Sequence, residues 1–171
     1  MSVVIGFHNP EEPYGFLSNW YHSEFKIDGI NFTSMEQFMM YQKAVWFQDN
    51  GIAKKILGTE DVAKIKKLGR CVSGYDDRLW SGVRQIVVYE GLMAKFSQNE
   101  ELRQALLDTG DAVLAECAVK DRIWGIGLSM TDERKSDPAQ WNGQNLLGYA
   151  LMMVRSRVKC LKSDRNNYVL L

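Results

Sequence analysis

Glu36 and Lys43 are an acid and a base set among methionines and aromatic residues in the segment TSMEQFMMYQKAVWF, residues 33–47. In an α-helix, residues seven apart lie within roughly 20° of each other around the axis and about 10 Å apart along it. That separation is too long for the usual i,i+4 ion pair, but it suits two groups that hold one substrate between them. The apolar residues on the same arc are Met35, Met39, Met40, Trp46 and Phe47. Both charged groups therefore project from an apolar face. A charge withdrawn from water there is costly unless it is paired, and such charges are often found at functional sites.

Structural roles for the two residues stay open at this point. Thr33-x-x-Glu36 has the spacing of a capping box, in which the Glu36 side chain would only serve the start of the helix. Ser34-x-x-Gln37 has the same spacing and would leave Glu36 out of the cap. Lys43 has a long aliphatic stem that can cover apolar neighbours while its amine reaches water. The residue types alone favour neither interpretation.

Two further segments combine aromatic side chains with polar groups. PYGFLSNWY places Ser18 and Asn19 beside Trp20, a mixture that suits a pocket for a heterocycle or a sugar but is also typical of a surface turn. AECAVKDRIWGIG places Asp121 near Trp124, followed by Gly125, which allows a ligand to approach the backbone closely. That run is not a G-x-G-x-x-G motif, so it predicts a phosphate loop only weakly.

Composition narrows the possible classes of protein. The chain has 171 residues, 21 basic and 21 acidic side chains, three cysteines and two histidines. A zero net charge does not favour a dedicated nucleic-acid binder, although it permits contact with a base through a small pocket. The three separated cysteines indicate reduced thiols, and no histidine–cysteine spacing suggests a metal site. With no signal peptide and no membrane-spanning stretch, we expect a cytoplasmic protein.

The pattern along the chain predicts an α+β fold that is compact and predominantly helical, with a few short strands, in a single domain over residues 1–171. An Asp28-Gly29 turn predicts a hairpin over residues 24–32. Other strands are expected at residues 2–7 and 112–119, and residues 121–129 form either a strand or a glycine-broken loop. Helices are expected at residues 33–47, 51–57, 60–68, 77–98, 99–110 and 143–160, with Gly58 and Gly69 as stops. The polar segment 130–141 is expected to be a surface loop.

Six motifs together carry a resemblance to a known family. They are GFLSNW, MEQFMMYQKA, LGR, LMAKFSQNEELRQALLDTGD, DRIWGIGL and GQNLLGYALMMVR. They occur in this order over residues 6–158, with residues 159–171 as a C-terminal tail, and they resemble the NADAR family, also called YbiA-like proteins. The sequence has Asn19 where glutamine is common in the family and Cys117 where a small residue is common. Neither departure touches the acid–lysine pair.

The resemblance implies an N-glycosidase that hydrolyses a ribosyl C1′–N bond, with no cofactor and no metal. One implied substrate class is the phosphorylated ribosylamino-pyrimidines of early riboflavin biosynthesis. The other is ADP-ribosylated guanine in DNA or RNA, from which an ADP-ribosylglycohydrolase would release ADP-ribose. The implied partners are thus a small-molecule ribosylamine or ADP-ribose ligand, or ADP-ribosylated guanine in DNA or RNA, and no membrane. The alternative is a non-catalytic module that binds ADP-ribose or a nucleotide unchanged.

The resemblance also suggests roles for the candidate residues. Glu36 is expected to stabilise the positive charge that develops at C1′, with Asp121 helping it or orienting water. Lys43, if desolvated, could attack an opened ribose as a Schiff-base nucleophile. Tryptophans are expected to stack on the base or wall the pocket, although Trp80 is of a type more often found in the core, and Asn19 and Asn145 are expected to read polar edges. The expected substrate-binding residues are Phe16, Ser18, Asn19, Trp20, Trp80, Trp124, Gly125 and Asn145.

Overall fold

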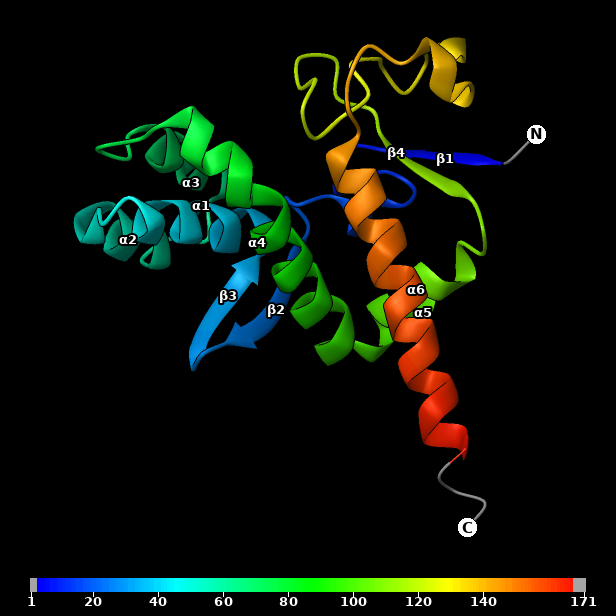
Figure 1. The fold of residues 1–171 in the computed structure, drawn as a ribbon, viewed down its shortest axis with the longest axis horizontal. Coiled ribbons are helices and arrows are strands. Elements are labelled where there is room, and N and C mark those ends of the chain that lie inside the picture. The colour runs from blue at the N-terminus through cyan, green and yellow to red at the C-terminus, as the bar shows by residue number, and fades with distance from the viewer. Residues whose placement is uncertain (1–2, 168–171) are drawn as a thin grey trace. The chain divides into compact units, whose positions relative to one another are not determined.

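The computed structural model describes the backbone of residues 3–167 and the side chains of residues 3–161 (Figure 1). The chain divides into two compact units. Unit 1 is formed by Met1–Ser18 and Phe96–Leu171, and unit 2 by Asn19–Lys95. The expected class, an α+β fold with mostly helices and a few short strands, is confirmed. Within the described residues no helix is both long enough and apolar enough to cross a membrane.

Unit 2 begins with the predicted hairpin. β2 (His22–Ile27) and β3 (Ile30–Ser34) pair antiparallel, with Phe25 opposite Phe32. Asp28 and Gly29 both adopt positive φ, of 49° and 81°, as a type I′ turn requires. β3 leads directly into the helix that carries Glu36 and Lys43.

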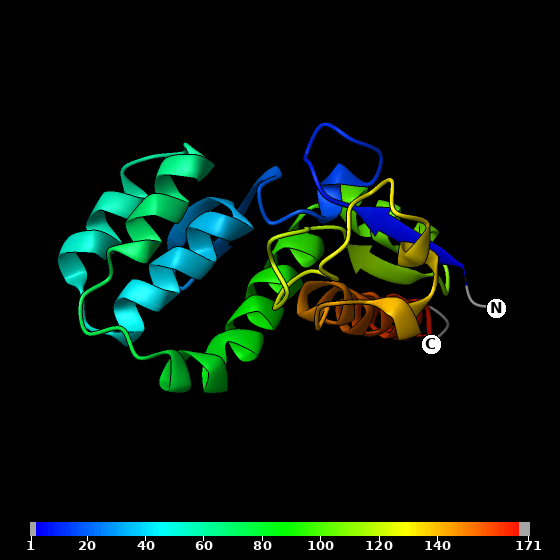
Figure 2. The same ribbon diagram turned by 90° about the horizontal axis from the view of Figure 1, so that it is seen from above.

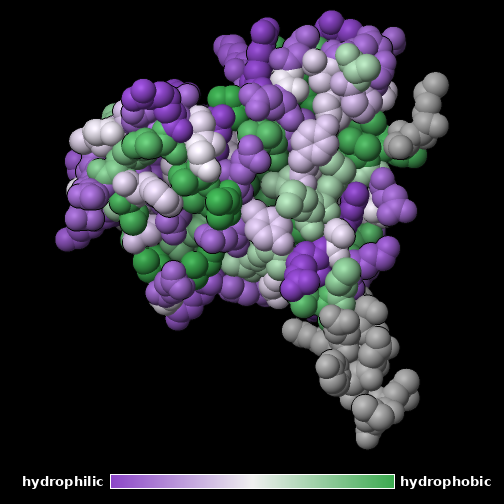
Figure 3. All heavy atoms as spheres, in the orientation of Figure 1, coloured by the Kyte–Doolittle hydropathy of each residue, from purple (hydrophilic) through white to green (hydrophobic). Residues whose placement is uncertain are grey.

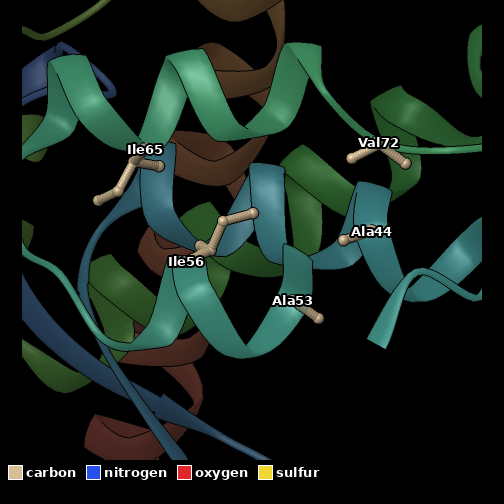
Figure 4. Close-up of a cluster of buried hydrophobic side chains, with 5 residues drawn as sticks. All are labelled: Ala44, Ala53, Ile56, Ile65 and Val72. Carbon is tan, nitrogen blue, oxygen red and sulfur yellow. The ribbon is translucent and has the colours of Figure 1, made fainter. Parts of the chain in front are cut away.

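Three helices of unit 2 pack around a small apolar core. They are α1 (Met35–Trp46), α2 (Asn50–Leu57) and α3 (Val62–Arg70). Figure 4 shows the buried side chains that α1, α2 and α3, together with the segment after α3, contribute to this core: Ala44, Ala53, Ile56, Ile65 and Val72. Burial of this apolar surface fixes the C-terminal half of α1 against both neighbours.

Two glycines set how closely other helices approach α1. Gly69 was expected to end its helix, but α3 continues through it to Arg70. A Cβ at Gly69 would collide with the side chain of Met40, so glycine is needed there for close helix packing and not as a stop. Gly91 has the same role in α4 (Asp77–Gln98), where a Cβ would meet Phe38 and Met35.

Unit 1 contains a two-stranded parallel sheet and two helices. β1 (Val4–Phe7) pairs with β4 (Val113–Glu116), with Val4 opposite Val113 and Phe7 opposite Glu116. The helices are α5 (Glu100–Asp108) and α6 (Leu146–Asn167), and α6 lies beside β4 (Figure 2). The sequence predicts both strands but not their pairing, which joins segments more than one hundred residues apart.

The segment between β4 and α6 is irregular. Residues 121–129 form a loop, which is one of the two expected alternatives, and the polar segment 130–141 is mostly exposed and hydrophilic (Figure 3). The short 3-10 helices of the chain are η1 (Gly15–Leu17), η2 (Glu133–Ser136) and η3 (Pro138–Gln140). α6 begins three residues later than expected, because Asn145 has a left-handed φ of 53°, and it ends later, at Asn167. The last four residues of the tail lie outside the described residues.

Candidate active site

The start of α1 shows which of the two possible capping boxes forms. Ser34 is the N-cap, and its hydroxyl oxygen accepts a hydrogen bond from the Gln37 backbone N–H at 3.1 Å. The Gln37 side chain reaches back and accepts from the Thr33 N–H at 2.8 Å, while its amide group donates to the carbonyls of Ile56 and Thr59. Ser34 and Gln37 thus supply capping hydrogen bonds at this helix start, through the Ser34 hydroxyl and the Gln37 side chain.

Glu36 is only 3% exposed, in the first turn of α1. The unpaired N–H groups of a helix start favour a negative charge there. Its own backbone N–H donates to the carbonyl of Asn19 at 2.9 Å, which brings these two predicted site residues together. A carboxylate withdrawn from water interacts more strongly with a developing positive charge than an exposed one would.

Asn19 carries a second signal of a ligand site. The residue is 7% exposed, and within the described part of the chain no hydrogen-bond donor reaches its buried Oδ1 atom. A buried polar atom without a partner costs roughly 1–3 kcal/mol, so such atoms are uncommon in folded proteins. An acceptor of this kind, next to Glu36, is suited to a hydroxyl or an N–H group of a ligand.

Lys43 is half-buried and its amine has two contacts. Nζ donates to the carbonyl of Gly69 at 2.8 Å and lies 4.0 Å from the centroid of the Tyr75 ring. Burial lowers the pKa of Lys43, an effect opposed by Asp77 and reinforced by Arg70. A lowered pKa increases the fraction of neutral amine, which is the nucleophilic form.

The apolar arc expected around this pair is only partly buried. Met35 and Met39 are in the core, whereas Trp46 at the end of α1 is 55% exposed. The arc therefore divides into a buried N-terminal half beside Glu36 and a more open C-terminal half beyond Lys43. Periodicity alone cannot distinguish these halves, because it does not show where the neighbouring helices end.

Two tryptophans of unit 2 differ in exposure. Trp80 in α4 is 5% exposed and belongs to the core. Trp20 is half-buried, and the amine of Lys66 lies 5.4 Å from its ring centroid. Of the two, Trp20 has the surface that stacking on a ligand needs.

The remaining predicted residues are in unit 1, where a turn gathers several of them. The Asp121 Oδ1 atom accepts hydrogen bonds from the backbone N–H groups of Ile123 and Trp124, at 3.0 and 2.9 Å. The Gly125 carbonyl accepts from the Asn145 N–H at 3.1 Å. Asp121 thus shapes the turn that presents Trp124, which is half-buried.

Asn145 is fully buried, and both ends of its side chain are bonded inside unit 1. Its Oδ1 accepts from the Glu116 N–H at 3.0 Å, and its Nδ2 donates to the Leu114 carbonyl at 2.8 Å. Any contribution to ligand binding therefore comes through the backbone that this amide holds. In the same unit, the Phe16 and Phe96 rings pack edge to face at 6.4 Å, and Ser18 follows η1 as a buried residue.

Two features escaped sequence reasoning. Lys95 is fully buried, and burial lowers its pKa to about 7. Its position, seven residues after Val88 on a helix whose Val88, Leu92 and Phe96 face the core, is the signal that could have revealed it. The second feature is His8, whose Nδ1 lies 2.7 Å from a carboxylate oxygen of Glu116. That contact depends on the β1–β4 pairing and has no local signal.

Among the described residues, no three His, Cys, Asp or Glu side chains are grouped so that they could hold a metal ion. Burial raises the pKa of the Cys117 thiol to about 11, so this cysteine is protonated near neutral pH and is a poor nucleophile. Glu36 and Lys43 in unit 2, together with the Asn19 acceptor, are the groups best suited to chemistry.

Comparisons with known proteins assign this chain to a family. The NADAR domain model matches residues 6–159. The N-glycosidase R617 of Acanthamoeba polyphaga mimivirus is 39% identical over 144 residues, covering 81% of this chain and 85% of that protein. The N-glycosidase YbiA of Escherichia coli (strain K12) is 30% identical over 156 residues, covering 91% and 89%.

Two further matches bear on fold and role. The riboflavin biosynthesis protein VVA0006 of Vibrio vulnificus (strain YJ016) is 33% identical over 159 residues, or 93% of this chain but only 40% of that protein. The NMR structure of E. coli YbiA superposes with a TM-score of 0.78 at 30% identity, covering 95% of this chain and 88% of that chain. The chain therefore belongs to the NADAR family of YbiA-like N-glycosidases, and by this homology it is a hydrolase of the N-glycosidase class.

Proposed function

We propose that this protein hydrolyses the ribosyl C1′–N bond of a phosphorylated ribosylamino-pyrimidine, and that Glu36 and Lys43 carry the reaction. The observation that supports this most strongly is local to α1. A buried acid and a half-buried amine with a lowered pKa lie on one helix, whose capping hydrogen bonds are made by Ser34 and Gln37.

Glu36 acts on the sugar in this proposal. Breaking the C1′–N bond builds positive charge at C1′, and a carboxylate already desolvated stabilises that charge without reorganising solvent. The unpartnered Asn19 Oδ1 accepts a hydrogen bond from a ribose hydroxyl. Binding the ribose would relieve the cost of burying that oxygen.

Lys43 acts as the nucleophile. In the ring-opened ribosylamine, C1′ is joined to the base nitrogen by a C=N double bond. The neutral amine adds to C1′ and forms a new C–N bond. The π electron pair of the double bond moves to the base nitrogen, and this nitrogen takes one proton from the attacking amine. The remaining bond from C1′ to the base nitrogen then breaks, its electron pair stays on that nitrogen, and a second proton from the lysine nitrogen goes to the same nitrogen. Water hydrolyses the resulting lysine imine, which releases ribose 5-phosphate and restores the free amine.

The pyrimidine substrate is favoured over ADP-ribosylated guanine by one comparison: a relative that matches almost the whole of this chain is named a riboflavin biosynthesis protein. The neutral net charge agrees with a small metabolite, since it offers no general attraction for the phosphates of a nucleic acid. We assign base contact to Trp20 in unit 2. Roles in substrate binding or catalysis for Trp124 and Gly125, and for Phe16, Ser18, Trp80, Asp121 and Asn145, stay predictions from the sequence.

The experiment is a paired hydrolysis assay with wild-type protein, Glu36→Gln and Lys43→Ala. One sample contains the ribosylamino-pyrimidine phosphate and is read by released ribose 5-phosphate. The other contains single-stranded DNA with ADP-ribosylated guanine and is read by released ADP-ribose. Lys54→Ala, which removes an exposed lysine of α2, is the matched control.

Turnover of the pyrimidine that both site variants lose and the control keeps is the expected result. Turnover of the DNA alone would move the proposal to the second substrate class. Hydrolysis of neither, together with tight ADP-ribose binding, would leave a binding module. Borohydride reduction during turnover should also attach the sugar to Lys43, and an adduct that persists in Lys43→Ala would exclude this nucleophile.

A further inference from the structure

We propose that Tyr75 is a positioning residue for Lys43: its ring covers the amine, limits the access of water and thereby keeps the amine ready to react. The inference rests on the proposed role of Lys43. Tyr75 lies in the segment between α3 and α4 and belongs to none of the motifs that carry the family resemblance.

Two contacts and a backbone turn hold the Tyr75 ring in place over the amine. Its hydroxyl donates to an Asp77 carboxylate oxygen at 2.7 Å. The Phe47 ring packs edge to face against it, with centroids 5.3 Å apart. Gly74, with a φ of 67° that favours glycine, turns the chain just before it. The ring is thus fixed from the end of α1 and from the start of α4.

The contacts of Lys43 indicate how the Tyr75 ring affects the hydration and the pKa of the amine. The Gly69 carbonyl fixes the direction of the amine, and the Tyr75 ring lies 4.0 Å away. A ring at this distance attracts the ammonium form, but it also displaces water that would stabilise that form far better. The largest influence on the Lys43 pKa is burial, which lowers it. We therefore take the loss of water, and not the attraction to the ring, as the main effect of the Tyr75 cover on the amine.

Charged groups around the amine and the ring must be included in any pH experiment. They are Asp77 and Arg84 on α4, Arg70 on α3, and Asp76 between these helices. The Tyr75 hydroxyl itself does not titrate near neutral pH, because burial and Asp77 raise its pKa to about 12. Changing Tyr75 to phenylalanine or alanine thus leaves the net charge of this cluster unchanged near neutral pH.

The test measures the amine directly, without substrate. Wild-type protein, Tyr75→Phe and Tyr75→Ala are labelled with trace acetic anhydride across a pH series, and the modification of Lys43 is quantified by mass spectrometry. Lys54, exposed on α2, is the internal reference. We expect Tyr75→Ala to label Lys43 roughly three- to tenfold more slowly, relative to Lys54, at neutral pH, because water returns to the amine and favours its charged form.

Tyr75→Phe keeps the ring and loses only the hydrogen bond to Asp77, so its Lys43 labelling should stay close to that of the wild type. Equal labelling profiles in all three proteins, with the fold intact by circular dichroism, would overturn the proposal, as would faster labelling in Tyr75→Ala. In the hydrolysis assay, the acidic limb of the kcat profile of Tyr75→Ala should move to higher pH. Since the labelling needs no substrate, it decides the role of Tyr75 even if the proposed reaction fails.

Discussion

Lys43 in the second half of α1 and Lys95 near the C-terminal end of α4 are two lysines of unit 2 that the fold withdraws from water to different depths. Lys43 is half-buried, with a carbonyl and an aromatic ring on its amine. Lys95 is fully buried, with its amine 5.4 Å from the centroid of the Tyr21 ring, and its pKa is lowered to about 7. The larger decrease in pKa thus belongs to Lys95, which the sequence analysis did not identify.

A lowered pKa and access to a substrate are separate requirements for a reactive amine, and the two lysines differ in both. Burial lowers the pKa of any amine, because it penalises the charged form. A nucleophile must also be reached by its substrate, and a fully buried group cannot be reached without movement of its surroundings. We therefore interpret Lys95 as part of the packing of α4 and Lys43 as the reactive amine.

The largest expected effect comes from exchanging each lysine for methionine, which tests whether Lys43, and not Lys95, is the reactive amine. Lys43→Met should lower kcat/KM on the order of 10³-fold or more, since it removes the proposed nucleophile. Lys95→Met should leave kcat/KM within about threefold of the wild-type value, because a buried amine makes no contact with substrate. Steady-state kinetics on both purified variants test this, with circular dichroism as the check of folding. A loss in Lys95→Met as large as that in Lys43→Met would reverse the assignment.

Glu36→Gln tests whether the buried acid beside Asn19 belongs with Lys43. The amide has nearly the same shape, so the fold should persist, while kcat should fall on the order of 10²–10³-fold as the stabilising charge is lost. The measurement is kcat together with the thermal midpoint. Unchanged kcat with a lower midpoint would make Glu36 a structural residue, like Gln37.

Asn19→Leu separates binding from stability. If the buried Oδ1 serves a ligand, its removal should raise KM about tenfold, the equivalent of one lost hydrogen bond. The free energy of unfolding should stay the same or increase, because the unpartnered atom no longer costs energy. Urea titration and steady-state kinetics measure the two effects. A less stable variant with an unchanged KM would contradict a ligand role.

The last expected effect is on stability alone, and it is the contribution of Lys95 to the pH dependence of the free energy of unfolding. A base whose pKa is lowered on folding makes the unfolded chain bind more protons, so stability rises with pH between the folded and unfolded pKa values. For Lys95 this window runs from about 7 to the ordinary value of 10.5. The wild-type free energy of unfolding should gain up to about 1.4 kcal/mol per pH unit there, relative to Lys95→Met. Parallel curves for the two proteins would show that the buried amine is not desolvated.

Local sequence patterns predicted much of the secondary structure. The Asp28-Gly29 turn and the helices that became α2 and α4 depend on residues a few positions apart, whereas the residue types alone left both capping boxes open. Interactions at this range depend on the identities of neighbouring side chains, which the sequence gives directly. The glycines were harder to interpret: Gly69 is a packing residue within α3, which only its contact with Met40 reveals.

The sequence by itself determined the helical α+β class, the acid and base on α1, and the motifs that mark the NADAR family. Tertiary structure alone decided which charged groups lose their water. It buried Lys95, placed the Tyr75 ring 4.0 Å from the Lys43 amine, joined His8 to Glu116 and left the Asn19 oxygen without a hydrogen-bond partner among the described residues. The physical reason is that solvation depends on every element packed around a group, and those elements come from distant parts of the chain.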